Sequence, residues 1–159
     1  MMENEESDAV QAAAQLAKQF HKGQVDKAGK DYFEGHLCTV ASYGENWKEQ
    51  AVGYLHDVAE DTPHTVSETI HLLQDKCPNV TTKDWDEIET ALNLMNSHTA
   101  ANREAYINRF RNNALAIRVK LNDLRHNMDI SRIPNPTEKD MARIKKYHYE
   151  YEQLKKMLE

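Results

Sequence analysis

Hydrophobic residues recur at intervals of three and four along most of this chain, which is the spacing that places them on one face of an α-helix. Runs of alternating hydrophobic and polar residues, which would indicate strands, are absent, and only five glycines and four prolines interrupt the pattern. We therefore predict an all-α fold, a single compact helical bundle, with helices over residues 7–20, 32–41, 45–62, 66–76, 83–95, 106–110, 115–127 and 138–158.

Polar residues mark several boundaries of these helices. Ser7 and Thr137 precede helical patterns as N-cap residues, and Thr65 with Glu68 fits a capping box. Residues 25–30 are predicted to form a loop. The 159 residues are enough to bury one core, so we expect one domain.

Residues 55–62 place four ionisable side chains within about two helical turns, between an apolar run and a proline. In a continuous helix, His56 and Glu60 would share one line, and Asp57 and Asp61 the next. Three carboxylates at this density repel one another unless a cation lies among them. A divalent metal would neutralise them and would bind imidazole nitrogen and carboxylate oxygen together. The alternative is a solvated, acidic helix end, and this stretch alone does not decide between the two.

Two further candidate ligands lie on other predicted helices. His36 shares a face with apolar residues, where a histidine is either a hydrogen-bonded core residue or a ligand. Asp123 lies close to the apolar stripe of residues 117–124, where a carboxylate requires a partner. His126 and Asn127 follow within about one turn and can orient or bind a group beside Asp123.

Composition narrows the classes of function. The net charge of -6 argues against general nucleic-acid binding, which depends on neutralising phosphates. Residues 111–146 nevertheless hold nine Lys/Arg against four Asp/Glu, which indicates either a local anion site or ordinary solvated helix faces. We expect a cytoplasmic protein without a membrane span, because the N-terminus is acidic and no run of 18 apolar residues occurs. Cys38 and Cys77 are expected to be reduced thiols.

The order of the candidate ligands along the chain (a histidine, a histidine-aspartate pair and an aspartate) is that of the HD-domain metal phosphohydrolases. The segments that together resemble the hydrolase domain of the RelA/SpoT alarmone enzymes are residues 21–24, 27–29, Tyr32, His36, residues 40–41, 55–62 and 119–123, with His126 and Asn127. The chain looks most like the stand-alone small alarmone hydrolases. This resemblance is strongest over residues 9–147 and implies a single HD-type phosphohydrolase domain over residues 1–159.

The resemblance implies a role for each matching residue. One Mn²⁺ ion would be held by His36, His56, Asp57 and Asp123. The attacking water would be activated, and protons handled, by Glu60 and Asp61. Nucleotide or phosphate would be contacted by Lys27, Asn127, Arg143 and Tyr147. The implied reaction is hydrolysis of the 3'-pyrophosphate of ppGpp or pppGpp, which releases pyrophosphate and GDP or GTP.

The chain departs from the family mainly in the loop that binds the base. Asp26 stands where the family carries an arginine that packs on the base, and Ala28 replaces a serine. The spacing from Tyr32 to His36 is one residue longer than in the family. Two alternatives therefore stay open. One is an HD-fold phosphohydrolase of another nucleotide, such as an NTP, a 5'-monophosphate or NADPH, and the other is a catalytically silent module that binds an alarmone. A third, weaker alternative is a helical structural protein, for which metal removal would change nothing.

Overall fold

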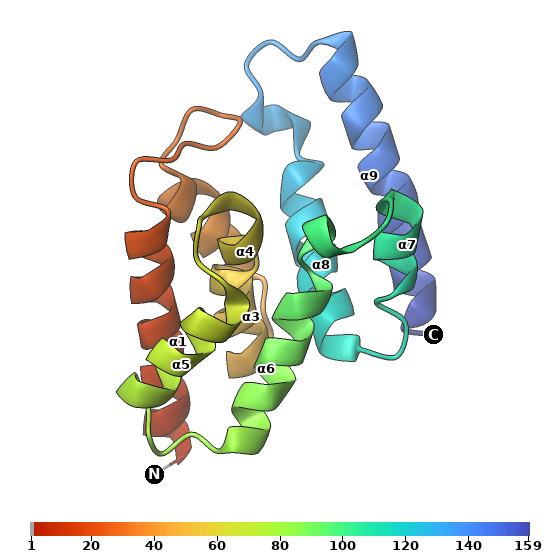
Figure 1. Cartoon of the computed structure of the whole chain (residues 1–159). Coiled ribbons are helices and arrows are strands. Elements are labelled where there is room, and N and C mark those ends of the chain that lie inside the picture. Colours follow the sequence, from red (N-terminus) through yellow and green to blue (C-terminus); the bar gives the residue numbers. More distant parts are fainter. Residues whose placement is uncertain (1) are drawn as a thin grey trace.

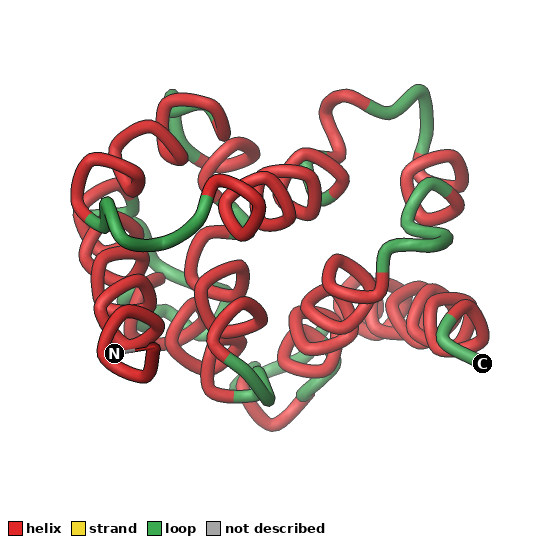
Figure 2. The backbone as a smooth tube through the Cα atoms, turned by 90° about the horizontal axis from the view of Figure 1, so that it is seen from below, coloured by secondary structure: helices red, strands yellow, loops and turns green. Residues whose placement is uncertain are grey.

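The computed structural model describes residues 2–159, with side chains from residue 4 onward, and its helices are joined by turns and short loops (Figures 1 and 2). Within residues 2–159 the nearest approach to a strand is an isolated bridge between Val25 and Asp31. The predicted all-α fold is confirmed. The elements are α1 (Met2–Phe20), the π-helix η1 (Phe33–Leu37), α2 (Cys38–Ser42), α3 (Trp47–Leu55), α4 (Val58–Asp61), α5 (Val66–Lys76), α6 (Thr82–Leu94), the 3₁₀ turn η2 (Ser97–Thr99), α7 (Arg103–Asn108), α8 (Ala114–Asn127), the 3₁₀ turn η3 (Ile130–Arg132) and α9 (Glu138–Met157).

Most predicted helix starts agree with the structure. The Thr65 side chain accepts a hydrogen bond from the Glu68 N–H at the start of α5. Thr137 and Asp140 form a capping box at the start of α9. The prediction for Ser7 was wrong, because α1 begins at Met2 and Ser7 lies inside it. Acidic residues near the start of a helix interact favourably with its dipole, which favours the additional turn over residues 3–6.

The hydrophobic pattern predicts one continuous helix over residues 45–62, but the structure breaks this helix within the central acidic stretch. Helix α3 ends at Leu55, α4 begins at Val58, and Asp57 lies between them with φ -102° and ψ 3°. In a continuous α-helix the Gly53 carbonyl would accept the Asp57 N–H. Here the His56 ring nitrogen Nδ1 lies 2.6 Å from that carbonyl oxygen. The break directs neighbouring side chains toward one point, which an α-helix prevents by turning each residue about 100° from the last.

The core lies between α1, α3, α6 and α8, and α9 covers α7 and α8 on the outside (Figure 1). Its largest fully buried side chains include Trp85, Tyr106 and Phe110, each of which contributes about 1.5–3 kcal/mol by leaving water. Helices α2 and α3 approach closely at Gly53, where an added Cβ would lie 2.9 Å from the Ala41 Cα. This close packing fixes α2 and η1 against the end of α3 that carries His56.

Both cysteines are free thiols, as predicted. No helix in the described part of the chain combines the length and the apolar character that a membrane span requires.

Candidate metal centre

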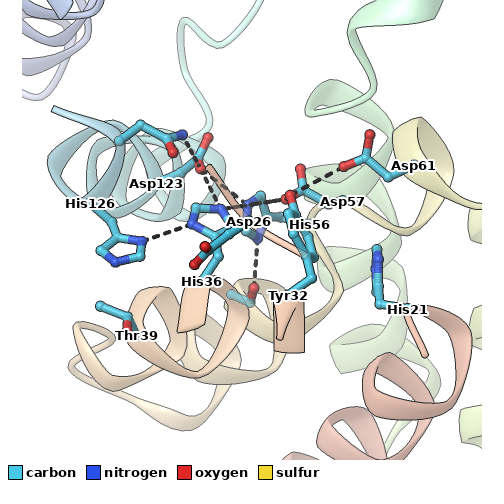
Figure 3. Close-up of polar contacts among 12 residues, drawn as sticks. His21, Asp26, Tyr32, His36, Thr39, His56, Asp57, Asp61, Asp123 and His126 are labelled. Atoms are coloured by element: carbon cyan, nitrogen blue, oxygen red, sulfur yellow. Dashed lines mark hydrogen bonds and ion pairs between the residues drawn. The ribbon is translucent and has the colours of Figure 1, made fainter. Parts of the chain in front are cut away.

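Side chains from three separate segments converge on one point (Figure 3). The His36 ring comes from η1, His56 and Asp57 from the break between α3 and α4, and Asp123 from α8. The two Nε2 atoms of the histidines are 3.3 Å apart. Asp123 Oδ1 lies 3.0 Å from Nε2 of His36 and 3.3 Å from Nε2 of His56. These three residues form a buried group whose donor atoms all lie within 4.8 Å of one another, and such a group could hold a metal ion.

Asp57 adds a fourth donor atom at the edge of this group. Its Oδ2 lies 3.0 Å from His56 Nε2 and 3.5 Å from His36 Nε2. Ligands at about 2.1 Å from a metal are about 3.0–3.4 Å apart when they occupy neighbouring coordination positions. The distances between the donor atoms therefore agree with a divalent ion among them, and the mixed imidazole and carboxylate set is one that Zn²⁺, Mn²⁺ and Fe²⁺ accept.

The second nitrogen of each histidine is engaged away from the centre. His56 Nδ1 bonds the Gly53 carbonyl oxygen, so this nitrogen carries the hydrogen and Nε2 has a free lone pair when the ring is neutral. His36 Nδ1 lies 2.8 Å from Nδ1 of His126, and the two rings stack with centroids 5.1 Å apart. Partners of this kind fix the tautomer and orientation of metal-binding histidines. His126, which the sequence predicted to orient a neighbouring group, supports His36.

Lys120 and Asn127 hold Asp123 in place. The ammonium group of Lys120 is 2.8 Å from Asp123 Oδ2, and the Asn127 amide donates to Oδ1 at 3.0 Å. Asn127, predicted to contact substrate, lines the cavity and also supports a candidate ligand. The long side chain of Lys120 is itself buried and passes over the Tyr106 ring.

The cluster is strongly coupled electrostatically. Burial disfavours the charged forms of Asp57 and Asp123, but His56 beside the first and Lys120 beside the second lower the pKa of each carboxyl below its usual value. Burial also opposes protonation of His36 and His56, yet the two carboxylates prevail and raise the pKa of both imidazoles. Protons on the imidazoles thus balance the carboxylates in the metal-free protein, and a bound cation would displace those protons.

The predicted catalytic residues Glu60 and Asp61 line the same cavity, which has a volume of about 280 Å³. Glu60 Oε1 accepts the backbone N–H of Ser97 at 2.7 Å, which links α4 to η2. The Tyr32 hydroxyl donates to Asp57 Oδ2 and lies 3.2 Å from Asp61 Oδ2 (Figure 3). Burial and the nearby Asp57 charge raise the pKa of Asp61. A carboxyl with a raised pKa beside candidate ligands is suited to proton transfer.

Two residues that follow the end of α1 hold the backbone of Asp61 in place. His21 is fully buried, and its Nδ1 lies 2.9 Å from Oε1 of Gln24. The Gln24 amide in turn donates to the backbone carbonyl of Asp61 at 2.9 Å. These two residues thus fix the backbone at Asp61.

The structure brings together two of the other predicted substrate contacts and separates the third. Lys27 Nζ lies 3.1 Å from the Tyr147 hydroxyl and 5.0 Å from the centre of its ring, and both residues line the cavity. Arg143 instead lies 3.5 Å from Asp140 on the same helix and is not among the residues that line the cavity.

Besides Asp26, four residues that line the cavity are not among the site residues predicted from the sequence: Tyr32, Arg103, Lys120 and Arg132. Arg103 forms a two-point ion pair with the buried Glu150, at 2.7 and 2.9 Å, which ties α7 to α9. Arg132 pairs with Asp26, which is 106 residues away. No local pattern predicts pairs so distant in sequence. Tyr32 could have been found, because its aromatic ring shortly before His36 belongs to the motif that carries the family resemblance.

The cavity lining contains five carboxylates and four cationic side chains besides His36. A divalent ion that displaces the imidazole protons would place its positive charge between the donor atoms, beside the cationic side chains of the lining. A comparison with protein-family models found no match, and a search of curated proteins found none either.

Proposed function

We propose that this protein is a metal-dependent phosphohydrolase of the HD type, with Mn²⁺ held by His36, His56, Asp57 and Asp123. The observation that supports this proposal most strongly is the convergence of the four donor side chains next to Glu60 and Asp61, with three of the four donors lining the same cavity as these two carboxylates. A purely structural cluster would not require two more carboxylates beside it, because further like charges raise its electrostatic cost.

The residues divide the chemistry among themselves. When bound, a divalent ion supplies Lewis acidity, which makes water more acidic and withdraws charge from a phosphoryl oxygen. Glu60, held by Ser97, accepts the proton of the attacking water. Asp61 has a raised pKa and returns a proton to the leaving group. Lys27 contacts the phosphate groups, since its partner Tyr147 is uncharged and leaves the positive charge available.

The leading candidate substrate is ppGpp or pppGpp, as in the RelA/SpoT hydrolases that the sequence resembles. Water would attack the 3'-linked phosphoryl group, the bond to the ribose oxygen would break, and that oxygen would take up a proton. The products would be GDP or GTP and pyrophosphate. A second candidate is another nucleotide. The observation that favours it is the ion pair of Asp26 with Arg132, in the loop where the family carries a base-stacking arginine.

Product analysis tests the proposal. Manganese-loaded protein would be incubated with ppGpp, pppGpp, NADPH, common NTPs and nucleoside monophosphates, with pyrophosphate and orthophosphate measured separately. We expect pyrophosphate from the alarmones. Orthophosphate, or turnover of another nucleotide only, would retain the metal site and reject the alarmone. Binding of the alarmone without turnover by the metal-loaded protein would identify a silent binding module.

The role of Glu60 is tested by Glu60→Gln, which is expected to keep bound manganese and to lose roughly a hundredfold or more in kcat. The exposed residue Glu152 on α9 provides a matched control as Glu152→Gln, which removes the same charge outside the cavity. Undiminished turnover by Glu60→Gln would contradict its assignment as general base.

A further inference from the structure

Asp26 uses its carboxylate to build the loop that follows α1. Oδ1 accepts the backbone N–H groups of Ala28 and Lys30 at 2.9 and 3.0 Å, and the Asp26 N–H donates to the Lys30 carbonyl at 2.7 Å. Gly35 makes room for this carboxylate, because a Cβ at that position would collide with Oδ2. Asp26 is nearly buried, and its hydrogen bonds leave little capacity for a ligand.

The remaining oxygen of Asp26 holds Arg132. Oδ2 lies 3.2 Å from one terminal nitrogen of Arg132, and the other terminal nitrogen donates to the His126 carbonyl at 2.9 Å. The guanidinium is thus fixed at two points. The backbone of the loop over residues 21–32 approaches η3 near the top of Figure 1. A guanidinium has five N–H donors, so these contacts leave donors available for a ligand.

Arg132 stands between two cavities. It lines the metal cavity together with Lys27, and it also lines a neighbouring cavity of about 750 Å³ that contains Lys30 and His126. Asp26 and Arg132 are the residues that both linings share. A ligand that reaches from the candidate metal into the second cavity would pass the guanidinium.

We infer that Arg132 contacts a phosphate group of the bound nucleotide and that Asp26 is the positioning residue that holds it there. This inference rests on the proposed function only in taking the ligand to be a phosphorylated nucleotide. A planar guanidinium fixed in orientation suits a phosphate, because it can donate two parallel hydrogen bonds to phosphate oxygens. The negative charge of Asp26 therefore supports anion recognition indirectly, through the cation that it orients.

Binding of GDP and of guanosine to the zinc-loaded protein, measured by ligand-observed NMR, tests this inference without requiring turnover. Arg132→Gln is expected to weaken GDP binding about ten- to hundredfold, the effect of losing a charged hydrogen bond, and to leave guanosine binding unchanged. The control Arg111→Gln removes an exposed charge outside both linings and should change neither.

An equal loss for GDP and guanosine would mean that Arg132 acts on the base or only on the loop, and would overturn the inference. So would unchanged GDP binding, or no GDP binding by the unmodified protein. If Arg132→Gln does not fold, Asp26→Asn serves instead, because its Oδ1 still accepts the two loop N–H groups while Arg132 loses its acceptor. It should weaken GDP binding severalfold and leave guanosine binding unchanged, and unchanged or tighter GDP binding would refute the positioning role. Failure of hydrolysis alone would sink the proposed function and leave this result standing.

Discussion

Loss of one candidate ligand should remove most of the stabilisation that a metal gives. A ligand that binds only the folded protein, at about 100 times its Kd, raises the free energy of unfolding by about 2.7 kcal/mol. For a chain of this length that corresponds to a rise in Tm of about 5–11 °C. Asp57 supplies a donor atom 3.0 and 3.5 Å from the two histidine Nε2 atoms, together with a full negative charge.

Replacing Asp57 by alanine should therefore weaken metal binding about a hundredfold or more. Loss of a residue that only supports a metal ligand lowers metal affinity by up to about a hundredfold, and loss of a ligand itself should cost at least as much. At the same manganese concentration the stabilisation then falls to about 0.4 kcal/mol, which is a rise in Tm of only about 1–2 °C. Circular dichroism melts with and without manganese would measure this difference within each variant. This comparison removes any effect of the substitution on the metal-free protein.

The exposed residue Asp75 on α5 provides the control, because Asp75→Ala removes the same charge away from the site. It should retain the full metal-induced rise in Tm. An equal rise in the unmodified protein and in Asp57→Ala would refute the assignment of Asp57 as a ligand. No rise in the unmodified protein, with manganese present at high concentration, would refute the metal site itself.

Two further predictions concern pH and packing. The carboxylates raise the pKa of His36 and His56 despite burial. The protonated imidazoles therefore stabilise the metal-free fold fully below about pH 6.5, the pKa of an ordinary histidine. This stabilisation is lost as the pH rises through the raised pKa values of the two histidines in the folded protein. The Tm of the metal-free protein should fall between pH 6 and pH 9 while manganese affinity rises, and opposite trends would contradict the coupling. Gly53→Ala should lower the free energy of unfolding in urea by about 1–3 kcal/mol, because the new Cβ meets the Ala41 backbone; an unchanged value would show that α2 and α3 can separate freely.

The fold could be predicted from the sequence to the extent that it depends on helical periodicity and local caps. Thr65 and Thr137 cap the helices that they were expected to cap. Ile117 and Leu124 of the apolar stripe of α8 are buried, as is Asp123, and Leu121 is partly buried. The break at residues 56 and 57 could not be predicted, because it depends on a side chain that competes for a backbone carbonyl. Periodicity contains no information about that competition.

The candidate site was predictable in its residue types and less so in its supporting contacts. His36, His56 and Asp123 are brought together as expected, because buried polar groups require partners. The direction of Arg143 toward Asp140 and the pairing of Arg132 with Asp26 depend on tertiary packing. Sequence spacing cannot rank such alternatives, since a long flexible side chain reaches several neighbours at similar cost.

The π-helix that carries His36 has a consequence for how chain length can vary in evolution. Adding one residue to an α-helix rotates everything beyond it by about 100°. In η1 the Cys38 N–H instead bonds the carbonyl of Phe33, five residues earlier, so a widened turn absorbs one residue locally. This widened turn lies directly after Tyr32 and contains His36. Related chains could thus gain or lose a residue here by a single insertion or deletion, while the imidazole keeps its direction and the following helix its packing.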